Sequence, residues 1–376
     1  MAFAPRSLTN NVVLFIHNVK VFFTHQDLSH GRRNIIFSNS KINVFRVSDA
    51  GIYYWVVSMT KWILTHSDGD GICAGALALA ANPDAQVFFT HPYGLLEDLG
   101  NIAAGDTVII CDIALLEDKL PEILNKFLEI SSSGELFYID HHPLPEGISV
   151  KDISGRVIHN INSSASELTY MLFHDKLSHL MGRVAIYGAI ADYLDDTPLI
   201  NRMLCSWDKR TIYFDTGVLV QGLEGRKRDH EFKRRVVAHL ASGQLPSQHT
   251  NLLNSALDNT RREEEIIRML DKWIHVYGDI AYTIDVPFSL GKTATYARAL
   301  TKALVGVAGE RRKGFIDMSL RTCEKSIDLN KILRHIAPNL GGSGGGHPQA
   351  AGARIPEENF NRFIQEVNES IRRRSE

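Results

Sequence analysis

The sequence predicts an α/β protein in which a domain built on a parallel sheet is joined by a helical linker to a smaller α/β domain. Short apolar runs alternate with helix-like segments between about residues 62 and 178, and a second strand-rich unit begins near residue 280 after a polar-helical stretch. With 44% hydrophobic and 22% charged residues, the composition excludes a disordered or fibrous chain. A formal charge of −2 excludes a polybasic protein, although a local basic patch can still bind nucleic acid.

Five apolar runs predict the strands of the first domain. They are residues 62–65, 86–89, 107–111, 135–139 and 157–159, and helix-like segments at 72–82, 115–130 and 163–178 lie between them. Strands that alternate with helices form βαβ units, which build a parallel sheet covered on both faces. The stretch 181–194 also has helical apolar spacing, so we assign residues 59–200 to this domain.

The rest of the chain divides at a long charged helix. Residues 201–278 are polar and helical and end in the segment Arg261 to Trp273, so we assign them to the linker. The smaller domain, residues 279–376, is expected to contain a strand from 280, a helix at 293–307, a strand at 314–321, a helix at 328–336 and a glycine-rich loop.

The first 58 residues show no sustained helical or strand period. We expect a loosely ordered extension there, with the functional protein beginning near Met59. No window reaches about 18 consecutive apolar residues, and no small-residue cleavage site follows the early apolar runs, so we expect neither a membrane span nor a signal peptide. Four scattered cysteines without a C-x-x-C pair suit a reducing compartment, which favours a cytoplasmic protein.

Acids and histidines collect where the predicted strands end. They are Asp68 and Asp70 after the first strand, Asp112 after the third, and Asp140, His141 and His142 after the fourth. Because parallel strands end at one edge of a sheet, these side chains are expected to meet there. Asp192 lies in the apolar stretch 181–194, where a carboxylate is costly unless it is paired or bound to a metal.

Each part of this pattern also has an ordinary structural explanation. Asp-Gly-Asp-Gly is most often a turn, an Asp that ends a strand is often a helix N-cap, and paired histidines are usually a surface or core feature. Their conjunction at one edge favours a metal site, since carboxylates with imidazole suit Mn²⁺ or Mg²⁺. So many carboxylates would repel one another without cations, which indicates two ions that share a bridging Asp.

The order of these residues resembles the DHH phosphoesterase superfamily, which includes RecJ-like exonucleases, nanoRNases, cyclic-dinucleotide phosphodiesterases and manganese pyrophosphatases. The matching features are Asp-x-Asp after the first strand, a lone Asp after a later strand, Asp-His-His, and an Asp in a helix. The stretch GGGHPQAAG at 344–352 resembles the GGGH motif of the domain that accompanies DHH in the nuclease branch. The resemblance covers roughly residues 60–376 and is strongest to archaeal RecJ-like exonucleases and nanoRNases.

The resemblance implies two Mn²⁺ ions, with Mg²⁺ as the alternative. One ion would be bound by Asp68 and Asp112 with His66, and the second by Asp70, Asp112, His141 and Asp192, so that Asp112 bridges. In pyrophosphatases and nanoRNases the first histidine lies four positions before Asp-x-Asp, where this chain has Leu64. His66 lies two positions before it, as in the archaeal branch.

The resemblance also implies two catalytic residues that are not ligands. His142 would lie beside the scissile phosphate, for phosphate contact or proton transfer. Asp140 would then orient an imidazole.

A glycine run at 341–346 is the main feature of the second domain. Without Cβ atoms, its backbone N–H groups could approach a phosphate closely. We therefore assign substrate binding to Gly344, Gly345, Gly346, His347 and, at the end of a predicted strand, Arg321. A flexible linker is the alternative, and the ordered pattern HPQAAGARI that follows argues against it.

Residues 226–235 contain six basic residues against two acidic ones. Such a run is usually a solvated helix face, and the functional alternative is a path for a single-stranded backbone. Residues 311–313 are a second candidate path. The sequence alone does not indicate which aromatic side chains would stack on bases.

Together these observations predict a metal-dependent phosphodiesterase that degrades single-stranded DNA or RNA exonucleolytically, in the manner of RecJ. One alternative is a nanoRNase or a phosphodiesterase for linear or cyclic dinucleotides, because no oligonucleotide-binding barrel follows residue 352 and the remaining residues predict one strand and one helix. The other is a replication or repair scaffold without catalysis, although the complete set of metal ligands argues against it. Replication or repair proteins are candidate partners in either case.

Overall fold

The computed structural model describes residues 13–16, 19–22, 42–46 and 53–373. The expected loosely ordered extension lies mostly outside the described residues. Within them, β1 (Val13–Ile16), β2 (Val19–Phe22), β3 (Ile42–Arg46) and β4 (Tyr53–Ser58) form an antiparallel sheet in the order β1-β2-β4-β3. The sequence analysis did not predict these strands, because they are short and separated by polar residues.

The predicted parallel sheet is confirmed. Its strands are β5 (Lys61–Thr65), β6 (Gln86–Phe89), β7 (Thr107–Cys111), β8 (Glu135–Asp140) and β9 (Arg156–His159), in the order β6-β5-β7-β8-β9. All neighbouring pairs are parallel. Both faces are buried because successive side chains alternate: Ile63 packs on one face of the sheet and Leu64 on the other.

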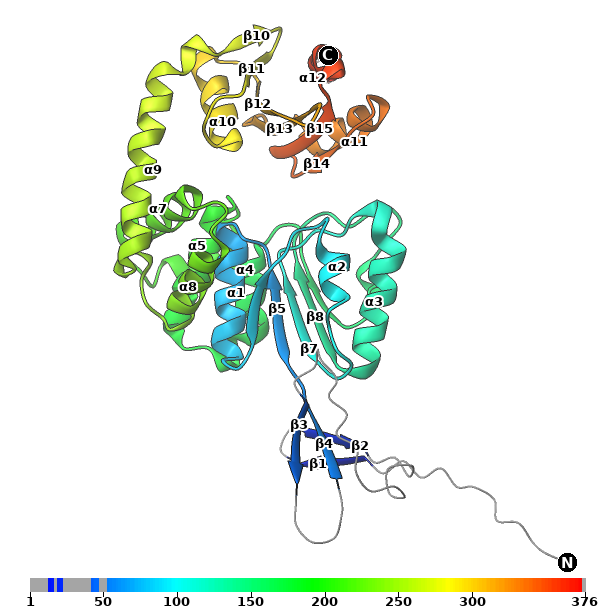
Figure 1. The fold of residues 1–376 in the computed structure, drawn as a ribbon. Helices are drawn as coiled ribbons and strands as arrows, with labels where there is room; N and C mark the ends of the chain where they lie inside the picture. Colours follow the sequence, from blue (N-terminus) through cyan, green and yellow to red (C-terminus); the bar gives the residue numbers. More distant parts are fainter. Residues whose placement is uncertain (1–12, 17–18, 23–41, 47–52, 374–376) are drawn as a thin grey trace, which may run out of the picture.

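Helices cover both faces of this sheet (Figure 1). They are α1 (Gly69–Ala81) and α4 (Ala165–Phe173) on one face, and α2 (Leu95–Leu99) and α3 (Leu120–Ser133) on the other. The short helix α2 was not predicted. Helix α1 begins at Gly69, earlier than expected, with Asp68 as its N-cap: the Asp68 carboxylate accepts a hydrogen bond from the Gly71 N–H at 3.0 Å.

The helices after α4 form a further layer on the α1 side of the first domain. Helix α5 (Gly182–Ala191) lies in the predicted first domain, α6 (Pro198–Leu204) spans its predicted end, and α7 (Lys209–Gly225), α8 (His230–Ala241) and α9 (Thr250–Met269) form the predicted helical region. Side chains of α5, α7 and α8 form one core cluster with those of α1, including Leu77, Ile186, Leu219 and Val236. Helix α9 runs along the side of the molecule and leads to the second domain (Figure 1).

The second domain is a mixed six-stranded sheet in the order β10-β11-β12-β13-β15-β14. Its elements are β10 (His275–Tyr277), β11 (Ile280–Ile284), α10 (Leu290–Thr301), β12 (Val305–Arg312), β13 (Phe315–Thr322), α11 (Leu329–Asn339), β14 (Ser343–Gly346), β15 (Ala350–Pro356) and α12 (Phe360–Arg372). Strands β11 and β12 are parallel and the other pairs antiparallel. The α/β fold class of both domains is therefore confirmed.

Two details of the second domain correct the sequence analysis. The expected helix at 293–307 ends at Thr301, where Lys302 adopts a left-handed conformation with φ of 59°, and β12 follows. The expected glycine loop is an edge strand, β14, paired with β15. Glycine is required there because a Cβ on Gly344 would lie 3.0 Å from the Leu333 Cβ and 3.2 Å from the Ala337 Cβ of α11. The glycines thus bring the strand close to the helix.

Among the described residues, no helix is both long and apolar enough to cross a membrane.

Candidate active site

The acids and histidines predicted at the carboxyl edge of the parallel sheet do meet there. Asp68 and Asp70 follow β5, Asp112 follows β7, and His141 follows β8. Among the described residues, four groups have ligand atoms within 4.8 Å of one another, and two of them match the predicted sets: His66, Asp68 and Asp112, and Asp70, Asp112 and His141. The other two are Asp112, Asp140 and His142, and the three histidines His141, His142 and His347. Asp112 belongs to both predicted sets, so its carboxylate lies between them; its role as a bridging ligand stays a prediction.

In the first set, the His66 Nδ1 atom lies 2.7 Å from Asp68 Oδ2 and 3.8 Å from Asp112 Oδ2. The Asp68 carboxylate raises the pKa of His66 above its ordinary value. His66 thus lies where its predicted role as a ligand requires.

In the second set, three carboxylates surround one imidazole nitrogen. His141 Nε2 lies 3.2 Å from Asp112 Oδ1, 3.5 Å from Asp192 Oδ2 and 3.9 Å from Asp70 Oδ2. Asp192 reaches this set as the residue that caps the C-terminus of α5, so it lies just beyond the helix in which it was predicted.

Asp70 is fixed by the first turn of α4, which the sequence analysis did not anticipate. Its carboxylate accepts hydrogen bonds from the Ala165 N–H at 2.7 Å and the Ser166 N–H at 2.9 Å. A helix N-terminus favours such an anion because its first N–H groups are unpaired within the helix. Gly188 of α5 leaves the necessary room, since a Cβ there would lie 2.6 Å from Asp70 Oδ1.

Asp112 has a strained backbone as well as a buried carboxylate. Its φ is 61°, a left-handed conformation that is uncommon for residues other than glycine. Its N–H donates a hydrogen bond to the Ile139 carbonyl at 2.9 Å, which links the ends of β7 and β8. Strain of this kind concentrates at functional sites, where the surrounding structure holds it in place.

The electrostatics of the cluster require compensating positive charge. Burial and the neighbouring carboxylates of Asp68, Asp70 and Asp192 raise the pKa of Asp112 well above its ordinary value. Burial, with Asp70 and Asp68, likewise raises the pKa of Asp192 to about 8. Asp112 Oδ2 and Asp192 Oδ2 are buried without a hydrogen-bond partner in the described part of the chain. These unpartnered oxygens beside imidazole are hard donors, so the residues fit divalent cations such as Mn²⁺ or Mg²⁺.

Asp140 and His142 form a separate pair beside the cluster. His142 Nδ1 lies 2.9 Å from Asp140 Oδ1, and the Tyr138 hydroxyl donates to Asp140 Oδ2 at 2.9 Å. Burial lowers the pKa of His142, but the Asp140 carboxylate outweighs this effect and raises it to about 9. Asp140 thus has the orienting geometry that the resemblance implied, and Tyr138, which sequence reasoning missed, fixes Asp140 in turn.

The second domain contributes His347 to the same place. Its ring centroid lies 5.1 Å from that of His141 and 5.1 Å from that of His142. His347 sits on a tight turn after β14, where its N–H and carbonyl exchange hydrogen bonds with Ala350. Burial and the neighbouring His142 and His141 lower the pKa of His347 to about 4, so its ring is neutral at pH 7.

Gly344, Gly345 and Gly346 belong to β14, the strand that leads directly to His347. The Gly346 N–H, one of the predicted phosphate contacts, donates to Asn330 Oδ1 at 3.0 Å and is therefore already paired.

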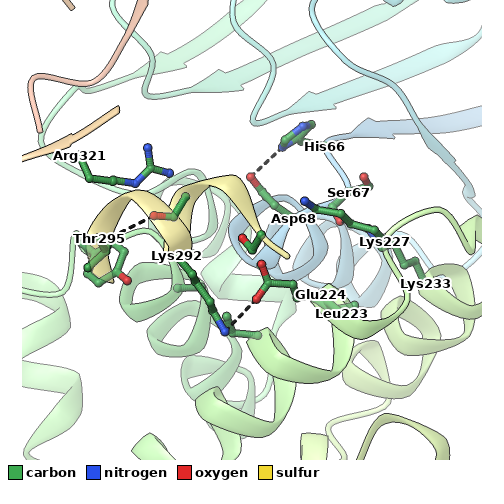
Figure 2. A pocket seen from close by; sticks show the side chains of 16 residues that line it. His66, Ser67, Asp68, Leu223, Glu224, Lys227, Lys233, Lys292, Thr295 and Arg321 are labelled. Carbon is green, nitrogen blue, oxygen red and sulfur yellow. Dashed lines mark hydrogen bonds and ion pairs between the residues drawn. The ribbon is translucent and has the colours of Figure 1, made fainter. Parts of the chain in front are cut away.

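A pocket of about 430 Å³ adjoins the cluster on the side of His66 and Asp68. Figure 2 shows Lys227 and Lys233 from the helical region, and Lys292 and Arg321 from the second domain, around this pocket. The pocket is thus lined by both domains and is rich in cations. Arg321, predicted to bind substrate, is among its lining residues.

The basic run 226–235 divides into two parts. Lys233 is buried, with Nζ 2.6 Å from the carbonyl oxygen of Ser67, and it lines the pocket with Lys227. Arg234 and Arg235 instead pair with Glu231 on the exposed face of α8. In the other run, Arg311 and Arg312 are paired with acids of their own domain and do not line the pocket.

Lys292 is a residue that sequence reasoning missed. Its Nζ lies 2.8 Å from Glu224 Oε2 and from Gln221 Oε1 of α7, and 2.8 Å from Glu263 Oε2 of α9. This cluster joins α10 of the second domain to the helical region. A lone lysine at the start of a helix gives no sequence signal for such a role.

A family model, the DHHA1 domain, matches residues 289–373. No curated protein matches the chain. Among solved structures, a DHH-domain protein described as a member of a family of ribosomal proteins has a TM-score of 0.62 at 12% identity, over 83% of this chain and 86% of that chain. RecJ of Thermus thermophilus, in complex with Mn²⁺, has a TM-score of 0.59 at 18% identity, over 84% of this chain and 52% of that chain.

The pGpG-specific phosphodiesterase PggH of Vibrio cholerae has a TM-score of 0.53 at 13% identity, over 83% of this chain and 99% of that chain. Identities this low show likeness of fold. With the match to the DHHA1 domain, they confirm the predicted resemblance to the DHH superfamily in architecture and in the identity of the second domain.

Proposed function

We propose that this chain, a protein of DHH fold whose second domain is a DHHA1 domain, is a metal-dependent phosphodiesterase that hydrolyses single-stranded nucleic acid from an end. One observation carries the proposal: His347 of the second domain lies against His141 and His142 at the carboxylate cluster, so that both domains complete one site. A phosphate bound beside these rings would meet imidazoles from both domains and the neighbouring carboxylate cluster.

The chemistry divides between cations and side chains. Two divalent cations held by the two carboxylate sets would, when bound, neutralise phosphate charge and activate a water molecule. Asp112 belongs to both sets and fixes them relative to each other. His142, with a raised pKa, holds a proton that it can donate to a phosphate oxygen or to the leaving oxygen, and Asp140 fixes its ring. Neutral His347 can donate one hydrogen bond from the second domain.

The cationic pocket supports a polymeric or nucleotide substrate. Lys227, Lys233 and Arg321 line it beside Asp68, where they can bind phosphates that flank the one being cleaved. A monophosphate or inorganic pyrophosphate would leave this pocket unused.

A second candidate is a phosphodiesterase for dinucleotides or very short oligonucleotides. The observation that favours it is the match to PggH over 99% of that chain, against 52% for RecJ of Thermus thermophilus and 89% for a second RecJ structure. The 430 Å³ pocket is also of the size that encloses a small ligand rather than a long groove.

The deciding experiment is digestion in Mn²⁺ of a 20-mer single-stranded DNA, the matching RNA and a dinucleotide, each labelled in turn at either end. A ladder from the long strands would support the exonuclease and give its polarity, whereas cleavage of the dinucleotide alone would support the second candidate. The variant Asp112→Asn, tested in parallel, is the control for contaminating nucleases. If the wild-type protein binds Mn²⁺ and nucleic acid but cleaves nothing, the chain is a binding scaffold and the proposal is wrong.

The role of the basic run can be tested separately. Lys227→Gln should weaken binding of a single strand and reduce the dependence of the binding constant on salt by about one unit of slope. Arg234→Gln is the matched control, because Arg234 pairs with Glu231 on the exposed face of α8. If the two substitutions change binding and its salt dependence equally, the whole run 226–235 is better explained as a solvated helix face.

A further inference from the structure

Tyr193 occupies a backbone position that normally favours glycine. It directly follows Asp192, the last residue of the carboxylate cluster, and its φ is 58°. The Leu194 N–H donates to the Ala189 carbonyl at 2.8 Å and the Tyr193 N–H donates to the Ile190 carbonyl at 3.2 Å. These two bonds define a Schellman motif at the end of α5, in which the left-handed residue is usually glycine.

Packing does not explain why a tyrosine, rather than a glycine, occupies this position. Tyr193 is 89% exposed, so little of its ring is covered by other side chains. A tyrosine in the left-handed region costs of order 1 kcal/mol relative to glycine. An exposed aromatic ring at a strained position therefore points to a role outside folding.

The location of the ring indicates what that role is. Tyr193 lines the 430 Å³ pocket, together with Lys227, Lys233 and Arg321. The cations can bind phosphate oxygens, but among the lining residues Tyr193 offers the one aromatic ring that is not engaged at the carboxylate cluster, as His66 is. Aromatic side chains stack on nucleobases without strong dependence on the base, because every base has a π-face.

We infer that Tyr193 is the stacking platform for the base of the nucleotide adjacent to the scissile phosphate, which occupies this pocket. The inference rests on the proposed function, because it takes the cleaved bond to lie at the neighbouring carboxylate cluster. The left-handed backbone holds the ring at the pocket beside Asp192, so binding of the base and placement of the phosphate at the cluster are linked through consecutive residues.

The test measures binding of hexanucleotides in EDTA, where no turnover occurs, by fluorescence anisotropy with the label at the far end. Each hexanucleotide carries either a normal or an abasic residue at one of its two termini. For the wild-type protein, loss of the base at one terminus should weaken binding about tenfold. Tyr193→Gly should lose the same tenfold on the normal strand and show no further loss on the abasic one, whereas Tyr193→Phe should behave as the wild type.

Tyr193→Gly is suited to this test because glycine relieves the left-handed strain, so the variant should be at least as stable as the wild type. If Tyr193→Gly weakens the normal and the abasic strands equally, or if the wild type ignores the base at both termini, the inference is wrong.

Hydrolysis of the same hexanucleotides in Mn²⁺ separates this result from the proposed function. If binding depends on the base but no hydrolysis occurs, the proposed phosphodiesterase activity is contradicted and the stacking role of Tyr193 is supported. If hydrolysis occurs and Tyr193→Gly leaves kcat/KM unchanged, the phosphodiesterase activity is supported and the stacking role is overturned.

Discussion

His347 and His142 lie with ring centroids 5.1 Å apart although they belong to different domains. Their surroundings shift their pKa values in opposite directions: burial lowers that of His347 to about 4, whereas for His142 the carboxylate of Asp140 outweighs burial and gives a value of about 9. One imidazole is therefore protonated and the other neutral at pH 7. A charged and a neutral donor, one from each domain, can contact the same phosphate. The site therefore needs both domains in contact.

The first prediction concerns His347. His347→Ala should reduce kcat/KM by about a hundredfold, because the site loses its contact from the second domain. Mn²⁺ affinity, measured by calorimetry, should change little, since His347 belongs to neither carboxylate set but only to an all-histidine group with His141 and His142. A loss of Mn²⁺ binding equal to the loss of activity would show that His347 is a ligand instead.

The second prediction concerns Asp112. Asp112→Asn should abolish hydrolysis, with at least roughly a thousandfold loss, because the shared carboxylate disappears. The same variant in EDTA should be more stable than the wild type, since it removes one of several buried carboxylates that repel one another. Asparagine is a better choice than alanine because it tolerates the left-handed backbone at this position. Thermal unfolding in EDTA checks the sign, and a lower stability of the variant would contradict this account of the cluster.

A third prediction concerns metal binding and stability. Mn²⁺ at about 100 times its Kd should stabilise the wild-type protein by about 2.7 kcal/mol for each site, because the ion binds the folded state. Asp112→Asn should lose most of this gain. Denaturant unfolding with and without Mn²⁺ measures it, and equal gains in the two proteins would place the bound ion elsewhere.

A fourth prediction compares two buried tyrosines. Tyr138→Phe removes a hydroxyl whose single proton lies within reach of both the Asp140 carboxylate and the Ile113 carbonyl, so it should cost about 1 kcal/mol of stability and reduce kcat about tenfold. Tyr187→Phe is the matched control, because the Tyr187 hydroxyl is buried without a hydrogen-bond partner in the described chain. That change should be neutral or stabilising and leave kcat unchanged. A similar loss of kcat in both variants would show that the effect of Tyr138 is not specific to Asp140.

The fifth prediction uses the Lys292 cluster. Lys292→Met leaves the Glu263 and Glu224 carboxylates without their cation and should destabilise the protein by about 1–3 kcal/mol at neutral pH. Burial raises the pKa of Glu263, but hydrogen bonds from Lys292, Tyr296 and Gln221 lower it below the ordinary 4.5. A lowered folded-state pKa contributes stability that is fully present above about pH 4.5 and is lost as the pH falls through the folded value.

The difference in unfolding free energy between wild type and Lys292→Met should therefore shrink below about pH 4.5. Arg268→Met, which breaks an exposed pair with Glu264, is the control and should cost less than about 1 kcal/mol. A wild-type advantage that stays constant down to about pH 3 would contradict the assigned coupling.

Much of the fold could be predicted because its signals are local. The central runs, above all 107–111, are buried on both faces, as strands inside a parallel sheet are, whereas the edge strands β6 and β9 are partly exposed. All five strands of the first domain were predicted within two residues, because each is a short apolar run between helix-like segments. The glycine run failed as a local signal. Glycine predicts a loop by its backbone freedom, but here its missing side chain allows β14 to pack against α11.

For the site, the sequence by itself determined that Asp68, Asp70, Asp112 and His141 lie together, because each follows a strand of one parallel sheet and the ends of parallel strands share an edge. Only the tertiary structure decided what surrounds them. Tyr138, Lys292 and Tyr193 carry no motif signal for their roles, because these depend on partners far away in the chain or on a strained backbone. Lys233 lies in the basic run that the sequence indicated, but only the structure separates it from the paired Arg234 and Arg235. The approach of His347 to His142 likewise depends on how two separately folded domains pack, a distance that no local pattern encodes.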